Sequence, residues 1–245
     1  YGLAESSVGL AFPPSARPPP VDRVDRSLLE TEGRALPVVE AGPDPLEDVA
    51  CGQPLRGHQI RIVDDRGREL PERRVGRLQF QGPSATSGYF RNPEATAKLF
   101  DGPWLESGDL AYIAGGDIYI TSRLKDMIVR AGRNIYPHEL EEAVGEIDGV
   151  RKGGVAVFGV RDPREGTERL VVLAETRETD EARRTELREE IQMASIDLTG
   201  TSADEVVMAL THAVLKTSSG KLMPAACRER YEQGLLKPQD RPLAL

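Results

Sequence analysis

The sequence predicts an α+β protein, and three observations support this fold class. Residues 57–123 contain short alternations of polar and apolar residues separated by glycine-containing turns, which is typical of antiparallel strands. Residues 126–245 combine helical periodicity with short apolar runs, as in a compact domain with its own core. The 245 residues are 39% hydrophobic and 29% charged, a globular balance that suits one large domain or two small ones.

Residues 13–49 predict little regular structure. The stretch "PPSARPPP" (13–20) excludes an interior helix and a central strand, because proline lacks the amide donor. The sequence that follows is charged and contains further prolines, so we expect a long excursion with one short helix near 26–34. Loops of this length are usually functional or disordered.

Regular structure is expected from residue 52 onwards. "HQIRIVDD" (58–65) and "VGRLQFQG" (75–82) predict strands of an antiparallel, partly barrel-like sheet over 52–122. "NPEATAKLF" predicts a helix with Asn92 as its N-cap and proline at its first position. "DLAYIAGGDIYITSR" predicts two strands around a Gly-Gly turn, with Asp109 just before the first of them.

The composition shifts near Lys125, which predicts a boundary between a first part at 1–124 and a second at 125–245. In the second part, apolar residues at helical spacing predict a helix over 138–147. The remaining elements are predicted as strands at 153–160, 169–175 and 204–210 and helices at 181–198 and 224–236.

Charge and cysteine content limit the function classes. A net charge of −8 argues against a nucleic-acid partner, because phosphate binding requires a basic face. No apolar run approaches the length of a membrane span. Cys51 and Cys227 lack a metal-binding spacing, so we expect a reduced, cytoplasmic chain.

The stretch "LKTSSGK" (215–221) suggests phosphate chemistry without being a P-loop. A P-loop has a first glycine five residues before its second and a hydroxyl residue after its lysine. Here Leu215 stands at the glycine position and Leu222 follows Lys221. Taken alone, the stretch predicts a solvated polar loop.

Three other stretches carry groups that suit a nucleotide. In "YGLAES", Tyr1 can stack on a base and Glu5 can hold a hard cation such as Mg²⁺. In "WLESGDLAYI", the carboxylate of Asp109 can accept hydrogen bonds from two ribose hydroxyls. "RLKDMIVRAGRNIYP" (123–137) gathers arginines that suit phosphate or ribose oxygens. Each alone has an ordinary interpretation as a surface aromatic, a turn aspartate or a charged linker.

Together and in this order, the four stretches resemble the adenylate-forming superfamily of acyl-CoA synthetases, fatty-acyl-AMP ligases, luciferases and nonribosomal adenylation domains. Three features are similar to the fatty-acyl-AMP ligase branch: "YGLAE", the excursion before "CGQPLRGHQIRIVD", and "GRNIYPHELE" with the ending "LKTSSGKLMPAACRERYEQG". The resemblance implies the end of a large N-terminal domain, with an antiparallel β-barrel-like subdomain, followed by a small mobile α+β C-terminal domain.

The resemblance implies a two-step acyl transfer. A fatty acid attacks the α-phosphate of ATP with Mg²⁺ bound, giving acyl-adenylate and pyrophosphate. The acyl group then passes to the phosphopantetheine thiol of an acyl carrier protein or carrier domain, with coenzyme A as the alternative acceptor. In this branch the excursion hinders the use of coenzyme A.

The resemblance also implies roles for individual residues. Charge grows on the α-phosphate and the attacking carboxylate during adenylation, and a flexible cation on a mobile domain can stabilise it. By motif position, the implied residues are Lys221 as the catalytic lysine, Tyr1, Gly2, Asp109, Tyr119 and Arg123 for the nucleotide, Glu5 for the metal, Lys125 at the hinge and Gly132 in the loop facing the thiol tunnel.

Two departures from the family pattern bear on activity. Ala4 lacks the hydroxyl that threonine supplies in most of the superfamily. The chain begins at "YGLAE", without an upstream phosphate loop, so we expect the C-terminal part of a larger enzyme that is inactive alone. Two alternatives remain: an AMP-forming fatty acyl-CoA synthetase and a non-catalytic nucleotide-binding or docking module.

Overall fold

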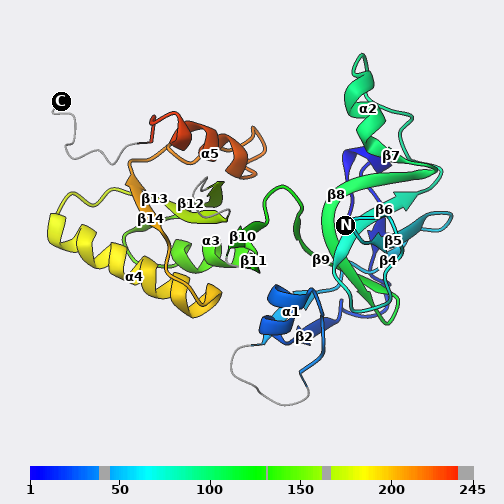
Figure 1. Cartoon of the computed structure of the whole chain (residues 1–245), viewed down its shortest axis with the longest axis horizontal. Helices are drawn as coiled ribbons and strands as arrows, with labels where there is room; N and C mark the ends of the chain where they lie inside the picture. The colour runs from blue at the N-terminus through cyan, green and yellow to red at the C-terminus, as the bar shows by residue number, and fades with distance from the viewer. Residues whose placement is uncertain (39–44, 131, 162–166, 237–245) are drawn as a thin grey trace. The chain divides into compact units, whose positions relative to one another are not determined.

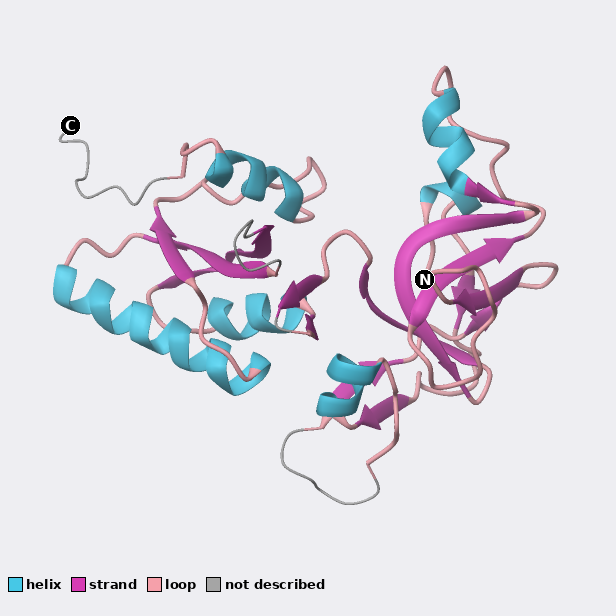
Figure 2. Cartoon of the chain, in the orientation of Figure 1, coloured by secondary structure: helices cyan, strands magenta, loops and turns pink. Residues whose placement is uncertain are grey.

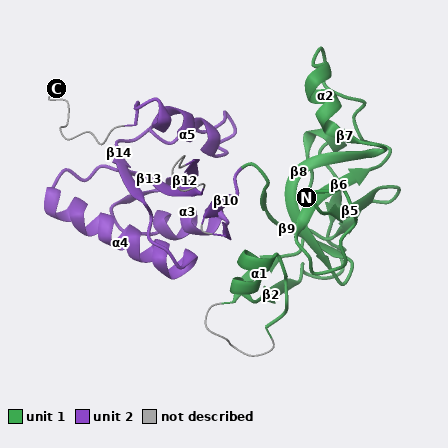
Figure 3. Cartoon of the chain, in the orientation of Figure 1, with its two compact units in different colours: residues 1–125 green, residues 126–245 purple. Residues whose placement is uncertain are grey.

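The computed structural model describes residues 1–38, 45–130, 132–161 and 167–236 (Figure 1). The chain divides into two compact units, Tyr1–Lys125 and Asp126–Leu245 (Figure 3). The division falls one residue after the boundary expected from the composition shift. Each unit has a mixed α+β structure and its own core.

A curled antiparallel sheet forms the centre of unit 1 (Figure 2). Its strands are β5 (Gln59–Val63), β6 (Gly76–Gln81), β7 (Phe100–Asp101), β8 (Trp104–Ala114) and β9 (Asp117–Arg123). They lie in the order β5-β6-β8-β7, and β9 also pairs with β8. The 3-10 helix η1 (Ala4–Ser6) follows the first residues of the chain.

Two short elements flank this sheet. The helix α2 (Pro93–Leu99) begins where the sequence predicts, and the Asn92 side chain caps it by accepting a hydrogen bond from Ala95 N. The strands β1 (Ala11–Phe12) and β4 (Gln53–Pro54) pair with each other, and Phe12 lies opposite Gln53. The excursion over 13–49 therefore leaves and rejoins the unit at neighbouring positions.

The excursion contains more regular structure than the single helix predicted for it. The helix α1 (Arg26–Glu32) lies where it was expected, capped by Asp25. Two strands that were not predicted, β2 (Val21–Val24) and β3 (Leu46–Val49), pair antiparallel on either side of it. The sequence did not predict these strands because prolines, which are atypical of strands, lie on either side of them. Residues 39–44 of the excursion lie outside the described part of the chain.

Polar contacts fix the excursion to the β8–β9 hairpin. The Arg17 guanidinium forms an ion pair of 2.7 Å with Asp117, a buried residue of β9. The Tyr112 hydroxyl of β8 lies 3.0 Å from Asp22 Oδ2 and 3.2 Å from Asp48 Oδ2. Asp22 and Asp48 are themselves cross-strand partners on β2 and β3. The described residues of the excursion are thus a folded part of unit 1.

A three-stranded sheet organises unit 2. Strand β13 (Glu168–Thr176) is central, antiparallel to β12 (Val150–Arg161) and parallel to β14 (Glu205–Ala209). The helices α3 (Pro137–Gly145) and α4 (Glu181–Thr199) lie on one face, and α5 (Pro224–Glu232) lies on the other (Figure 1). Alternate residues of the strands therefore enter two separate apolar clusters.

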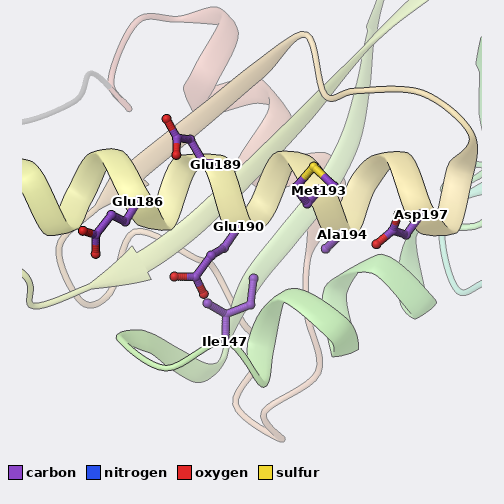
Figure 4. A pocket seen from close by; sticks show the side chains of 7 residues that line it. All are labelled: Ile147, Glu186, Glu189, Glu190, Met193, Ala194 and Asp197. Carbon is purple, nitrogen blue, oxygen red and sulfur yellow. The ribbon is translucent and has the colours of Figure 1, made fainter.

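In unit 2, the helix predicted over 224–236 ends at Glu232, and three further details were not foreseen from the sequence. The helix predicted over 138–147 ends at Gly145, so Ile147 packs on the core from the following turn. The segment with the clustered arginines forms a small hairpin of β10 (Ile128–Arg130) and β11 (Arg133–Ile135). A shallow groove lies between α4 and the turn after α3, bordered by Ile147, Glu190 and Met193 (Figure 4).

Within the described residues, no helix is long and apolar enough to cross a membrane.

Candidate functional site

Asp109 lies inside β8, not just before the strand as the sequence predicted. Three residues of β8 (107–109) face only Leu78 of β6, because the pairing jumps from Leu110 opposite Arg77 to Glu106 opposite Gln79. The Ser107 hydroxyl stabilises this bulge by donating to Leu78 O (2.8 Å) and accepting from Asp109 N (3.0 Å). A bulge redirects a side chain without ending the strand. Local sequence patterns do not indicate a bulge, which explains why Asp109 was placed just before the strand.

Tyr1, Asp109 and Arg123 come together at this bulge. The Tyr1 hydroxyl donates a hydrogen bond to Asp109 Oδ2. Arg123 is the cross-strand partner of Asp109, and its Nε lies 3.8 Å from Asp109 Oδ1. The Asp109 side chain is 13% exposed and that of Arg123 is 59% exposed. Burial and the hydrogen bond to Asp109 raise the pKa of the Tyr1 hydroxyl above its usual value of 10.

The first turn of the chain is tightly folded, and Gly2 is required there. A Cβ atom at Gly2 would lie 1.4 Å from the carbonyl oxygen of Val8, so only glycine fits. The backbone reverses through Ser7 and Val8, which both have positive φ. Positive φ is rare for a β-branched residue such as valine. This turn places Glu5 on the same unit as Tyr1 and Asp109.

Glu5 has a partner that the sequence did not predict. The Tyr89 hydroxyl donates to Glu5 Oε1 (2.6 Å), and this carboxylate raises the pKa of Tyr89 to about 12. Tyr89 N in turn donates to Thr96 Oγ1 of α2 (2.9 Å). Tyr89 belongs to the motif "GYFRNPEAT", and its place in this motif was the available signal.

Glu5 offers a single carboxylate to a metal ion. Among the described residues, no three His, Cys, Asp or Glu side chains gather in a geometry that would hold a metal. Mg²⁺ is commonly bound by one or two carboxylates together with substrate phosphates and water. Glu5 therefore fits Mg²⁺ that arrives with a nucleotide.

Tyr119 is placed differently from the other predicted nucleotide-binding residues. It is 4% exposed, and its ring stacks on Tyr112 with centroids 4.9 Å apart. Little of this side chain is accessible to a ligand in the structure. The stack supports the hairpin of β8 and β9, which carries Asp109 and Arg123 at its other end.

In unit 2, Lys221 ends a compact turn. Thr217 N donates to Lys221 O (2.8 Å), and Lys221 N donates to Thr217 Oγ1 (3.1 Å). Gly220 has φ +85° and allows the chain to reverse. The Lys221 side chain is exposed, and its ammonium group forms no ion pair with any described residue. The loop is therefore ordered at its backbone and presents a free cation.

The two remaining predicted residues lie in turns near the division of the units. Lys125 is exposed in the turn after β9, as the last residue of unit 1. Gly132 lies in the turn between β10 and β11 with φ +80°. A Cβ atom at Gly132 would meet nothing within 4 Å, so its conformation, not crowding, favours glycine.

Comparison with known proteins decides the family. No family model matches the chain. An acyl-CoA synthetase of Caulobacter vibrioides is 38% identical over 237 residues, which cover 96% of this chain and 41% of the relative. The long-chain-fatty-acid–AMP ligase FadD26 of Mycobacterium tuberculosis is 33% identical, with 98% of this chain and 43% of the relative covered. The chain belongs to the adenylate-forming superfamily.

Solved structures of this superfamily share the fold. A structure from a study of fatty acyl-adenylate ligases of E. coli and L. pneumophila matches 96% of this chain with a TM-score of 0.85 and 31% identity, covering 41% of that protein. The structure of McyG A-PCP complexed with phenylalanyl-adenylate matches 96% of this chain with a TM-score of 0.76 and 31% identity, covering 39% of that protein. The chain spans about two fifths of the length of the relatives it matches.

Proposed function

We propose that the full-length protein is a fatty-acyl-AMP ligase that transfers its acyl group to an acyl carrier protein. The observation that supports this best is the juxtaposition of Tyr1, Asp109 and Arg123 at the bulge of β8. These residues come from three of the motifs, and Tyr1 lies 108 positions from Asp109 in the sequence. Their contact gives a carboxylate flanked by an aromatic ring and a cation, which suits the ribose and phosphate of an adenylate.

In the adenylation step, the residues of unit 1 would hold the nucleotide. Asp109 accepts the ribose hydroxyls, since a carboxylate has further acceptor sites beside the one that Tyr1 occupies. The Tyr1 ring packs on adenine, with Gly2 shaping the turn, and Arg123 contacts ribose or phosphate oxygens. Tyr119 acts through its stack on Tyr112, as a support for the hairpin. Glu5, oriented by Tyr89, holds Mg²⁺, which neutralises phosphate charge when bound.

Lys221 would supply the cation for the transition state. The ammonium group is a mobile point charge, and it helps most where negative charge grows between the fatty-acid carboxylate and the α-phosphate. We propose that unit 2 is a mobile domain that turns about Lys125 between the two half-reactions. In the second state Lys221 withdraws, and the hairpin with Gly132 faces the incoming thiol.

The excursion over 13–49, whose described residues are folded, favours a carrier-protein acceptor. It is held to the β8–β9 hairpin by Arg17 and Asp22. A structured element of this kind can exclude the nucleotide moiety of coenzyme A while a carrier-bound arm enters from elsewhere. The similarity to FadD26, which is named a long-chain-fatty-acid–AMP ligase, supports the AMP-ligase part of the proposal.

An AMP-forming acyl-CoA synthetase is the second candidate. The relative of Caulobacter vibrioides with 38% identity is described as an acyl-CoA synthetase, which favours it. The experiment that separates the two supplies the full-length protein with ATP, Mg²⁺, a fatty acid and either coenzyme A or a holo carrier protein. The proposal predicts acyl-carrier as the main product. Rapid formation of acyl-CoA would contradict the proposal and favour the second candidate. Failure to release pyrophosphate with either acceptor would favour a non-catalytic module.

A further inference from the structure

Two glutamates of β13 contact the two loops to which the proposed function gives roles in unit 2. Glu175 lies near the end of the strand, and Oε1 accepts a hydrogen bond from Val214 N (2.8 Å). Val214 is the residue immediately before "LKTSSGK". Glu168 is the first residue of the strand, and Oε2 accepts from Val129 N (2.8 Å) in the β10–β11 hairpin. The Cα atoms of the two glutamates are seven positions apart along the strand, which corresponds to about 23 Å.

The Glu175 carboxylate is buried, and both of its oxygens accept hydrogen bonds. Its side chain is 0% exposed, and Oε2 accepts from the Arg151 guanidinium (2.6 Å) while Oε1 binds Val214 N. The next backbone amide, Leu215 N, donates to the Sγ of Cys227 on α5 (3.2 Å). A buried amide left without an acceptor is unfavourable. The start of the loop that carries Lys221 (the lysine loop, residues 215–221) therefore depends on this carboxylate.

Two glycines of β12 make room for these carboxylates. A Cβ atom at Gly154 would lie 2.9 Å from Glu175 Oε2, and one at Gly159 would lie 2.8 Å from Glu168 Cδ. Both glycines belong to the stretch "GGVAVFGV", which the sequence predicts only as a buried strand. Near each end of β13, a glutamate carboxylate thus lies against a glycine of β12 and accepts a hydrogen bond from a loop.

We propose that Glu175 and Glu168 are positioning residues, each of which fixes one functional loop of unit 2: Glu175 the lysine loop and Glu168 the β10–β11 hairpin. The functional part of this inference rests on the proposed function, in which Lys221 acts in adenylation and the hairpin acts in thiol transfer. Because the two anchors are separate, their effects on the two half-reactions are separable. A misplacement of about 1 Å can slow an enzymatic step by about a hundredfold.

Hydrogen exchange and half-reaction rates of the full-length protein test this with Glu175→Ala and Glu168→Ala. Glu175→Ala should speed amide exchange in residues 213–221 by about tenfold or more and slow pyrophosphate release by a similar factor. Exchange in 128–135 and transfer from preformed acyl-adenylate should stay within about threefold. Glu168→Ala should show the reverse pattern. Glutamine at either position keeps an acceptor oxygen and should restore most of the lost rate.

Equal effects of both alanine variants on both loops, or no effect on either, would overturn the proposal. If an alanine variant does not fold, Gly159→Ala crowds the Glu168 carboxylate alone, and Gly154→Ala crowds the Glu175 side chain together with Arg151 O. Neither variant removes a carboxylate, and the two should give the same two patterns. Lys221→Ala separates this inference from the proposed function. If Lys221→Ala leaves adenylation unchanged, the proposed function is wrong, while the exchange data still decide whether each glutamate anchors its loop.

Discussion

The Tyr1 hydroxyl donates a hydrogen bond to the Asp109 carboxylate, across 108 positions of the sequence. The contact fixes one carboxylate oxygen and leaves the other toward Arg123. It therefore links the first turn of the chain to the bulge of β8. If Asp109 binds ribose, Tyr1 determines how that carboxylate is oriented.

Replacing Tyr1 by phenylalanine tests this orientation. The ring remains available for stacking on adenine, but the hydrogen bond to Asp109 is lost. We expect the KM for ATP to rise by about threefold to tenfold with a smaller change in kcat, in line with a contribution of about 1 kcal/mol from one hydrogen bond. Initial rates of pyrophosphate release by the full-length protein measure both constants. An unchanged KM would show that Tyr1 does not orient Asp109.

The Tyr112 hydroxyl should make unit 1 sensitive to alkaline pH. Burial and the charges of Asp48 and Asp22 raise its pKa above the usual value of 10. A raised folded-state pKa contributes stability that is complete below about pH 10, the pKa of the unfolded chain, and is lost as the pH rises above it. In urea denaturation, Tyr112→Phe should lower the free energy of unfolding at pH 8 by about 1–2 kcal/mol. The stability of the variant should then fall less than that of the parent between pH 10 and 11, and an equal fall would contradict the assignment.

Tyr89 should affect the metal dependence of adenylation through Glu5. Without its hydroxyl, the Glu5 carboxylate loses the partner that holds it at 2.6 Å. We expect Tyr89→Phe to raise the Mg²⁺ concentration for half-maximal activity by about threefold to tenfold, since a freely rotating ligand must be ordered on binding. The matched control is Phe90→Ala, an exposed neighbour whose removal should leave this concentration unchanged. Equal shifts in both variants would contradict a specific role for Tyr89.

Removing the excursion should relax the choice of acceptor. Because Phe12 and Gln53 are cross-strand partners, deleting 13–49 leaves a three-residue connection of Ala50, Cys51 and Gly52 between β1 and β4. The ratio of acyl-CoA to acyl-carrier formed should then rise severalfold. This ratio is the proper measurement because the deletion also removes the partners of the Tyr112 hydroxyl, Asp22 and Asp48, and so lowers stability, which affects both products alike. No gain in acyl-CoA would mean that the excursion is not the barrier.

Local signals in the sequence predicted local structure well. The Asn92 cap, the helix that begins at Pro93 and the hairpin around Gly115 and Gly116 depend on neighbouring residues, and the structure contains all of them. The strands β2 and β3 were missed because their short pairing is long-range and flanked by prolines. Such pairing is set by tertiary contacts, which periodicity does not record.

The site shows the same limit. The motifs supplied the residue types, and the structure brings Tyr1, Asp109 and Arg123 together. The partner of Glu5 was not foreseen, because Tyr89 is 84 residues away in the sequence. Tyr119, which was expected to line the adenine side, lies in a buried stack with Tyr112. The roles assigned to all of the predicted site residues remain predictions.

Lys221 is the residue on which the proposed mechanism depends, and the neighbouring Lys216 provides a matched control from the same stretch. Pyrophosphate release by full-length Lys221→Ala and Lys216→Ala, with ATP, Mg²⁺ and a fatty acid, is the most direct measurement. Loss of a group that stabilises transition-state charge typically slows catalysis by about a hundredfold or more. We predict that loss for Lys221→Ala alone, with transfer from preformed acyl-adenylate retained. Unchanged pyrophosphate release in Lys221→Ala would contradict the account.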